Sequence, residues 1–316
     1  MTGQDNIADQ FPEGGYHEPV MLHEALEGLQ IRPDGVYVDC TFGGGGHSAA
    51  ILRALGPDGV LIAFDQDPDA AANMPEDSRL LFVPQNFRHL QRFLKLHKHS
   101  QVDGILADLG VSSHQFDEPA RGFSYRFDAE MDMRMDKRSE LTAARILETY
   151  SREKLHRMFE KLGEVTNART LADCIVKEQG TGRLKTTLGF RDAVAGIVKG
   201  NPNKYFAKVF QALRMEVNDE LGALESLLQQ LPGALRTGGR VAIITFHSLE
   251  DRMVKNYFRY GSASEPAADD LYGAKPQRSL KIITRKPVLP SDAEVERNPR
   301  SRSAKLRVAE KTAFSE

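Results

Sequence analysis

Four consecutive glycines follow a short apolar stretch in the segment VYVDCTFGGGGHS, residues 36–48. A buried strand that runs into a glycine-rich turn and then a helix is the opening unit of a nucleotide-binding α/β fold. Glycine suits such a turn because the backbone bends sharply and a ligand can approach where no Cβ projects. A helix is expected over residues 47–55, and the next apolar run ends at Asp65, 22 positions beyond Gly43. Folds of this kind place a carboxylate for ribose hydroxyls at a similar spacing.

The same glycines distinguish between classes of cofactor. A dinucleotide fingerprint has a third glycine where this chain has Ser48, so the pattern is a weak match to NAD binding. S-adenosyl-L-methionine contains ribose and adenine but no phosphate, and it therefore needs the turn and the acid without a pyrophosphate cradle. Its carboxylate would lie at the helix N-terminus, where free N–H groups favour an anion. A glycine-rich surface turn without a ligand is the alternative, and the flanking strands and Asp65 argue against it.

Further strand patterns follow the opening unit and alternate with helical ones. Strands are expected at residues 80–83, 102–108 and 241–245, and a final pair at 280–284 and 306–308 is expected to form an antiparallel edge. Strands that alternate with helices predict an α/β fold with a doubly wound, mostly parallel sheet. Ligands of such sheets bind outside the carboxyl ends of the strands.

A stretch of about 100 residues without any strand pattern interrupts the α/β chain. Helices are expected there at residues 142–150, 152–162, 167–177 and 190–199. This composition predicts an inserted all-helical domain. The predicted division is a flexible tail at 1–15, a cofactor-binding domain at 16–112 and 215–316, and the helical domain at 113–214. Met131, Met133 and Met135 alternate within a loop, a spacing unlike a helix face, and are expected to fill a core beneath it.

The charge distribution and the cysteine content indicate which kinds of partner and which cellular compartment to expect. The chain has 316 residues and a net charge of −2, but residues 275–316 alone carry eleven Lys or Arg against five acids. A basic segment in a near-neutral protein is consistent with a polyanionic partner or with a solvated tail. Only Cys40 and Cys174 occur, without metal-ligand spacing, which predicts a cytoplasmic protein without a zinc site. No run of 18 apolar residues and no secretory signal is apparent.

Several side chains are candidates for chemistry, each with a simpler structural alternative. Asp65 is the best candidate for the ribose hydroxyls, or else an acid of a turn. Phe87 is placed to stack on adenine, or else belongs to the core. Asp108 ends the fourth strand. His47 contacts the cofactor or caps its helix, and His247 is an acid or base or only hydrogen-bonds its own loop.

A set of sequence blocks resembles one known family. These blocks are HEPVML, DCTFGGGGHS, FDQDP, DGILADLGVSS, RGFS, DMRMD, FQALRMEVNDEL, TGGRVAIITFHSLEDRMVK and NPRSRSAKLRVAEK. Together they span residues 16–311 and are similar to the MraW/RsmH family of bacterial methyltransferases, which modify the exocyclic N4 of a cytidine in 16S ribosomal RNA.

The resemblance implies a class I S-adenosyl-L-methionine-dependent methyltransferase fold, with 16S ribosomal RNA of the small subunit as partner and no metal. The cofactor positions that it implies are Gly45, Gly46, His47, Asp65, Phe87, Asp108 and Gln115. Asp108 is also the candidate catalytic residue, because an acceptor for the N4 hydrogens would stabilise the developing cation. Amino methyltransferases commonly follow this acid with Pro-Pro and an aromatic residue, whereas Leu109, Gly110 and Val111 follow it here.

Two other functions remain open at this point. One is a methyltransferase that acts on DNA or on a small molecule, and the other is a catalytically silent RNA-binding or assembly factor. The basic segment and the inserted helices favour a large polyanion as substrate. The intact glycine turn, Asp65 and Asp108 argue against loss of cofactor binding.

Overall fold

The computed structural model of this chain describes residues 19–264 and 279–313. The predicted tail at 1–15 lies outside these residues. A loop expected to be mobile at 261–270 is described only as far as Ser264.

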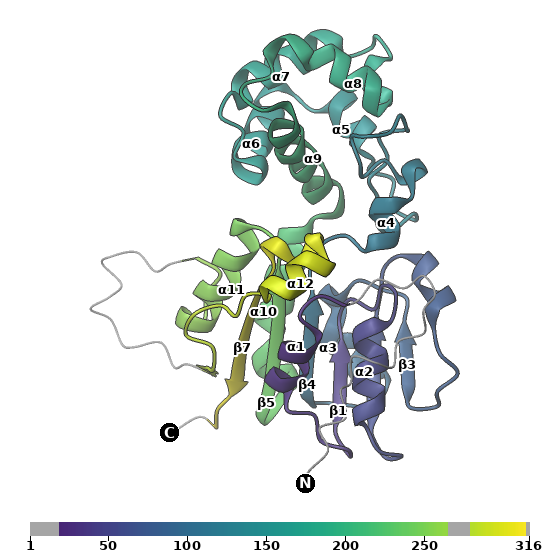
Figure 1. Cartoon of the computed structure of the whole chain (residues 1–316), viewed down its shortest axis with the longest axis vertical. Helices are drawn as coiled ribbons and strands as arrows, with labels where there is room; N and C mark the ends of the chain where they lie inside the picture. Colours follow the sequence, from purple (N-terminus) through teal and green to yellow (C-terminus); the bar gives the residue numbers. More distant parts are fainter. Residues whose placement is uncertain (1–18, 265–278, 314–316) are drawn as a thin grey trace, which may run out of the picture.

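One seven-stranded sheet organises the α/β part of the molecule (Figure 1). Its strands are β1 (Val36–Asp39), β2 (Val60–Phe64), β3 (Leu80–Val83), β4 (Val102–Asp108), β5 (Leu235–Thr245), β6 (Leu280–Ile282) and β7 (Lys305–Lys311). The spatial order is β3-β2-β1-β4-β5-β7-β6; the first five strands are parallel, and β7 pairs antiparallel with β5 and β6. The doubly wound, mostly parallel sheet with an antiparallel edge is therefore confirmed.

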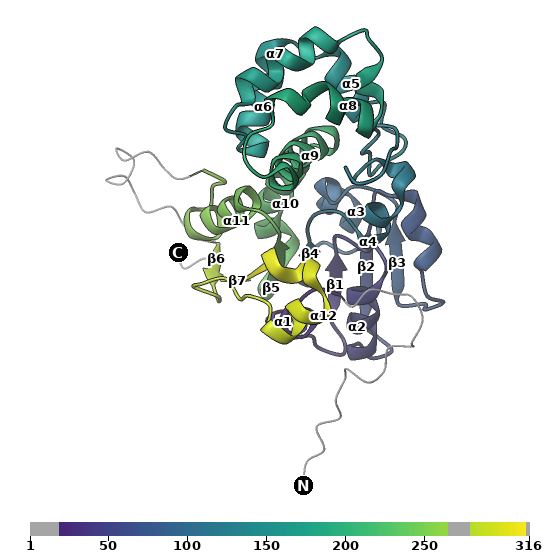
Figure 2. The ribbon, with the colours of Figure 1, turned by 45° about the horizontal axis from the view of Figure 1, so that its top comes forward.

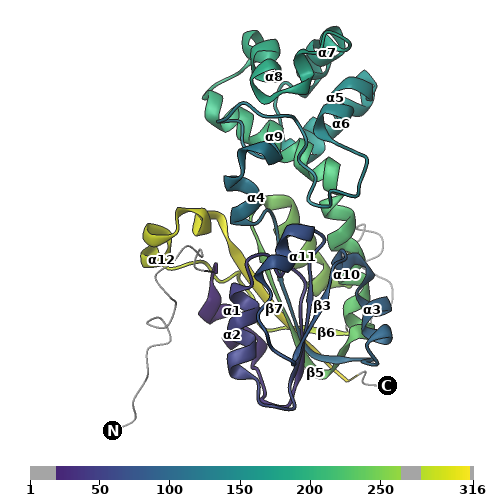
Figure 3. The same ribbon diagram turned by 90° about the vertical axis from the view of Figure 1, so that its right-hand side faces the viewer.

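Helices cover both faces of this sheet (Figure 3). On one face lie α1 (Leu22–Leu29), α2 (Gly46–Ala54) and α12 (Asp292–Arg297); on the other lie α3 (Leu90–Leu96), α10 (Glu220–Ala234) and α11 (Ser248–Tyr260). Alternate residues of β1 show how the strands serve both layers. Val36 and Val38 pack with α3, α10 and α11, whereas Tyr37 packs with α1 and α2. Strands covered on both faces are expected to be almost wholly apolar, as β1, β2 and β3 are apart from Asp39.

A helical unit rises above the carboxyl ends of the strands (Figures 1 and 2). It follows α4 (Ser113–Asp117) and contains α5 (Ala143–Thr149), α6 (Arg152–Gly163), α7 (Ala168–Glu178), α8 (Thr187–Val194) and α9 (Pro202–Asn218). These helices bury a hydrophobic core of their own, and Met131, Met133 and Met135 belong to it. The predicted role of these methionines as core filler is confirmed.

Some predicted elements differ from those observed. The alanine-rich segment after β2, expected to be a helix, is the short 3-10 helix Pro68–Asn73, with Asp67 as its cap. The longest helix, α9, had not been recognised; Asn201 caps it and Pro202 occupies its first turn. The predicted domain boundary between residues 214 and 215 falls inside α9. The division of the chain into domains stays a prediction.

Candidate active site at the carboxyl ends of the strands

A cavity of about 850 Å³ opens at the carboxyl ends of β1, β2 and β4. The glycine-rich turn, the 3-10 helix after β3 and the start of α4 line one part of it. Asp108, Phe246, Glu220, Glu250 and Asn298 line another part. Small-molecule sites typically measure about 300–1,000 Å³, so this cavity has room for a cofactor together with part of a second molecule.

The conformation of the glycine turn depends on the absence of side chains. Gly45 has a φ of 79°, in the left-handed region, and directly precedes α2. A Cβ on Gly46 would lie 2.3 Å from Cγ of Pro19, so no larger residue fits there. Neither residue offers a side-chain cap, and the first N–H groups of α2 therefore remain available to an anion.

Asp39 holds this turn against the end of β1. Its side chain is 1 % exposed, and its two oxygens accept hydrogen bonds from the Thr41 amide at 3.0 Å and from the Ser48 hydroxyl at 2.7 Å. The buried acid thus orders the backbone around the glycines. Asp39 had not been predicted as a site residue beyond its position at the strand end.

Asp65 follows β2 and lies beside the turn. Its two oxygens accept hydrogen bonds from the amides of Gly43 at 2.7 Å and Asp67 at 2.8 Å. Burial raises the pKa of Asp65 to about 6, although these two hydrogen bonds act to lower it. Each carboxylate oxygen can accept more than one hydrogen bond, so Asp65 retains acceptor capacity towards the cavity that it lines.

A buried ion pair fixes the neighbouring wall. Asp67 is 4 % exposed and accepts hydrogen bonds from Nε2 of Gln115 at 2.7 Å and from the guanidinium of Arg121 at 2.8 Å. Arg121 is itself buried. Its guanidinium also donates to Asp69 and to the carbonyls of Arg134 and Met135, in the loop that carries Met131, Met133 and Met135 (the methionine loop). Gln115 completes a capping box with Ser112 at the start of α4. The network joins the end of β2, α4 and the methionine loop.

His47 and Asp108 face one another across the cavity floor. Nε2 of His47 lies 3.1 Å from the Val20 carbonyl, and because a carbonyl only accepts, this nitrogen carries the hydrogen. Nδ1 then has no hydrogen, and it lies 3.8 Å from Oδ2 of Asp108. Burial lowers the pKa of His47. Burial also raises the pKa of Asp108 well above its usual range, and the nearby carboxylate of Asp39 raises it further.

The two oxygens of Asp108 have different surroundings. Oδ1 is buried and has no hydrogen-bond partner among the residues that the structure describes. The side chain as a whole is 23 % exposed and lines the cavity. A buried polar atom without a partner is rare in native proteins and calls for an explanation such as a missing ligand.

A second group of ionisable residues lies near Asp108. His247 caps α11, its Nδ1 accepting from the Glu250 amide at 3.4 Å. Its Nε2 lies 3.0 Å from Glu250 Oε1 but makes no hydrogen bond. Glu250 is buried, which acts to raise its pKa, yet His247, the Phe246 amide and the Arg214 charge together outweigh burial and the pKa is lowered. The observed contacts of His247 are local, as in the interpretation that it only hydrogen-bonds its own loop.

These residues also form the one candidate metal cluster among the described residues, Glu220, His247 and Glu250. Both oxygens of Glu220, however, accept hydrogen bonds from the Arg214 guanidinium, at 2.8 and 2.9 Å. Glu250 accepts from the Phe246 amide at 2.9 Å. The local geometry is that of an ion-pair network, and the prediction that no metal is needed stays a prediction.

Segments from both ends of the described chain complete the cavity. Pro19 and Val20 lie against the glycine turn and His47, and the Met21 amide donates to buried Glu294 of α12 at 2.8 Å. After α12, the chain passes through the 3-10 helix Pro299–Ser303, where Arg300 pairs with Asp117 of α4. These wall segments had not been recognised as part of the site. They are distant in sequence from the glycine turn, and no local pattern connects them to it.

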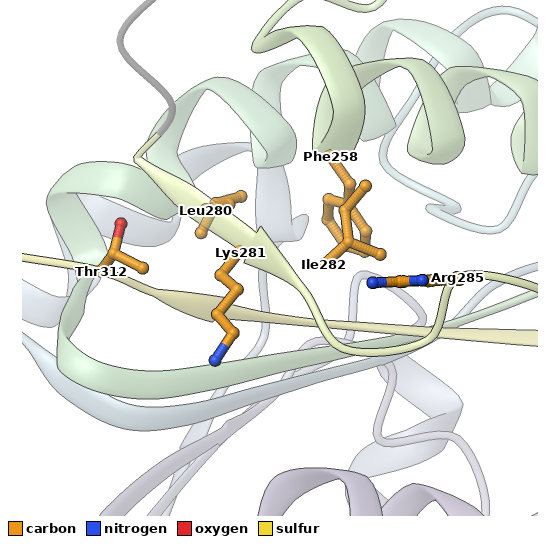
Figure 4. A pocket seen from close by; sticks show the side chains of 6 residues that line it. All are labelled: Phe258, Leu280, Lys281, Ile282, Arg285 and Thr312. Atoms are coloured by element: carbon orange, nitrogen blue, oxygen red, sulfur yellow. The ribbon is translucent and has the colours of Figure 1, made fainter.

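A smaller cavity of about 430 Å³ lies at the sheet edge, between α11 and β6 (Figure 4). Phe258, Leu280 and Ile282 supply apolar surface, and Lys281 and Arg285 supply charge. Among the described residues, neither a carboxylate nor a glycine turn lines it. We therefore place the candidate active site in the larger cavity.

The structure brings together every residue predicted to bind the cofactor. The residues that line the larger cavity include Gly45, Gly46, His47, Asp65, Phe87, Asp108 and Gln115. Phe87 also packs against the sheet core, as the alternative interpretation expected, and its stacking on adenine stays a prediction. The binding roles of these seven residues stay predictions.

Comparison with known proteins gives a consistent result. The model of the MraW methylase family matches residues 15–312. "Ribosomal RNA small subunit methyltransferase H" of Parabacteroides distasonis is 51% identical over 298 residues, which are 94% of this chain and 97% of that protein. The protein of the same name from Porphyromonas gingivalis is 53% identical over 305 residues, 95% of this chain and 98% of the relative. By both measures, the chain belongs to the MraW methylase family.

Proposed function

We propose that this protein transfers a methyl group from S-adenosyl-L-methionine to the exocyclic N4 of a cytidine in the 16S ribosomal RNA of the small subunit. The observation that carries the proposal is one cavity in which a glycine turn, Asp65 and Asp108 meet. Family membership and relatives named as methyltransferases of the small-subunit ribosomal RNA support it.

The residues present fit S-adenosyl-L-methionine. The N–H groups at the start of α2 would receive its carboxylate, Asp65 its ribose hydroxyls, and Phe87 its adenine. The acids that line the cavity suit a cofactor with a positively charged sulfonium. When bound, this cofactor supplies an electrophilic methyl carbon. Gly45, Gly46, His47 and Gln115 would complete the binding surface.

The protein's own contribution to the reaction is to position the reacting groups. The N4 amine of cytosine is conjugated with its ring and is a weak nucleophile, but no proton has to leave before attack. The protein therefore has to hold nitrogen, methyl carbon and sulfur in line, with the reacting atoms about 3–3.5 Å apart. We assign Asp108 as the acceptor for an N4 hydrogen, which localises the nitrogen lone pair and stabilises the developing positive charge.

The target cytidine has to leave its stack to reach this cavity. We propose that the RNA binds across the loop at 121–138, the inserted helices and the basic C-terminal segment. In this assignment residues 113–214 form an RNA-recognition unit. The described part of the chain contains no helix long and apolar enough to cross a membrane. We place the protein in the cytoplasm, where ribosomes are assembled.

Transfer of labelled methyl groups tests this function directly. Purified small subunits that lack the modification are incubated with labelled S-adenosyl-L-methionine and with wild type or Asp65→Ala. We expect labelled N4-methylcytidine with wild type. Asp65→Ala is expected to weaken cofactor binding roughly 100-fold, because two charge-assisted hydrogen bonds are lost.

The alternatives predict different results in the same assay. A methyltransferase for DNA or a small molecule would bind the cofactor in calorimetry but would leave the subunits unlabelled. A silent assembly factor would bind subunits and transfer no methyl group to any substrate. Unchanged N4-methylcytidine in ribosomal RNA from a deletion strain would contradict the proposed reaction.

The pKa of Asp65 predicts how cofactor binding depends on pH. Ribose hydroxyls donate to the ionised carboxylate, and the pKa of about 6 in the free protein means that this form is lost below pH 6. Affinity should therefore be constant above about pH 7 and about tenfold weaker at pH 5. Calorimetry between pH 5 and 8 measures the effect, and Asp65→Asn should flatten the profile. An equally steep loss of affinity in Asp65→Asn would assign the titration to another group.

A further inference from the structure

The charges that line the cavity are strongly one-sided. Five carboxylates line it, those of Asp65, Asp108, Asp117, Glu220 and Glu250. Among the described residues, Arg300 is the only Lys or Arg that does so. An acidic lining suits a cationic cofactor and the amino edge of cytosine. It does not suit the phosphate that a nucleotide brings with it.

Arg300 is held at the cavity wall by a short, well-anchored segment. Ser301 is fully buried, and its hydroxyl donates to the Asn298 carbonyl at 2.8 Å. The Asn298 amide in turn donates to the Glu294 carbonyl of α12 at 2.7 Å. Figures 1 and 3 show α12 beside the carboxyl ends of the strands. The fold therefore places the guanidinium at the rim without relying on a mobile loop.

The contacts of Arg300 are of a kind that a phosphate can replace. Both terminal nitrogens of its guanidinium bond the two carboxylate oxygens of Asp117, and the guanidinium lies 5.3 Å from the centroid of the Phe116 ring. Arg300 is 40 % exposed and Asp117 48 %, so solvent screens the pair and little free energy opposes its exchange. A planar guanidinium that forms two parallel bonds to a carboxylate matches a phosphate in the same way.

We propose that Arg300 binds a backbone phosphate adjoining the nucleotide whose base enters the cavity, and that it exchanges Asp117 for that phosphate. The inference rests on the proposed function, since it needs an RNA substrate. Arg300 then fixes the position of the extruded nucleotide, while the acidic wall receives the base edge. In the protein without RNA, Asp117 keeps the guanidinium in the orientation in which the phosphate is bound.

A different role for the same pair would be purely structural. The bond between Arg300 and Asp117 joins the C-terminal wall to α4, and it would then serve only to keep the cavity closed. The two roles differ in what Asp117 contributes. A closing contact needs both partners equally, whereas phosphate binding needs Arg300 and competes with Asp117.

Steady-state kinetics with unmodified small subunits separates these roles. We compare wild type with Arg300→Ala, Asp117→Asn and Arg53→Ala, which removes the same charge from an exposed position of α2, outside the cavity lining and outside the proposed RNA surface. Arg300→Ala is expected to raise KM for subunits at least tenfold, and its dissociation constant for S-adenosyl-L-methionine should stay within about twofold of wild type. The number of ions released on subunit binding, given by the slope of log K against the logarithm of the salt concentration, should fall by about one. Asp117→Asn should lower KM for subunits.

The outcomes distinguish the inference from the function on which it rests. Equal rises in KM for Arg300→Ala and Asp117→Asn would show a closing contact and overturn the proposal. A salt dependence in Arg300→Ala equal to that of Arg53→Ala would overturn it as well. Failure of the wild-type protein to label subunits would instead refute the proposed function, irrespective of Arg300.

Discussion

Asp108→Asn is expected to lower kcat for methyl transfer about 100- to 1,000-fold, the range found when one preorganised electrostatic contact to a transition state is removed. The asparagine keeps the shape of the side chain, and the backbone contact between the Asp108 amide and Thr41 Oγ1, 2.8 Å long, is retained. What is lost is a carboxylate at the cavity wall, and an amide oxygen is a weaker acceptor for an N4 hydrogen. Single-turnover methyl transfer to small subunits measures the effect.

Cofactor affinity distinguishes a catalytic Asp108 from one that only holds the cofactor. If Asp108 receives the N4 hydrogen, the dissociation constant of S-adenosyl-L-methionine should change by less than about fivefold while kcat falls. Asp58→Asn, an exposed acid in the turn before β2, is the matched control and should behave like wild type. Loss of cofactor affinity with an unchanged single-turnover rate at saturation would contradict the catalytic role.

Arg121→Met is expected to lower the free energy of unfolding by about 3–5 kcal/mol, because it leaves the buried carboxylate of Asp67 without its cation. The two side chains of the ion pair are 8 % and 5 % exposed, so solvent does not replace the lost partner. Arg121 also bonds the carbonyls of Arg134 and Met135, which lose their donor in the variant. Urea unfolding, followed by circular dichroism, measures the change.

A matched substitution in the same loop provides the comparison. Arg138→Met removes an ion pair with Asp136, but Arg138 is 53 % exposed. Surface pairs of this kind contribute about 0–1 kcal/mol, so this variant should remain close to wild type. If both variants lose the same small amount of stability, the pair between Arg121 and Asp67 is not the structural link described above.

The sheet could be predicted from the sequence because each strand is marked by residues that lie close together in the chain. Each parallel strand contains a short apolar run, and Asp39 and Asp108 end two of the strands, so both acids lie at the edge of the sheet formed by the carboxyl ends. The glycine turn and Asp65 were recognised for the same reason. The alternation of the three methionines was likewise enough to distinguish a packed loop from a helix face.

The rest of the site depends on contacts between distant parts of the chain. Met21 meets Glu294, and Arg300 meets Asp117, pairs separated by 273 and 183 residues. Neither pair leaves a periodic pattern or a fixed spacing. No helix had been predicted at α9, whose first turn, Pro202-Asn203-Lys204, is polar and gives no apolar period at its start.

The position of β7 within the sheet has a consequence for biosynthesis. During translation β1 to β4 appear first, then the helical unit with its separate core, then β5, and β7 is the latest of the described strands. Until then one edge of β5 lacks its partner, and an exposed strand edge invites wrong pairing. Distant pairings of this kind also form slowly. The sheet therefore closes only after Lys311 has been synthesised, later than the helical unit, whose core is separate.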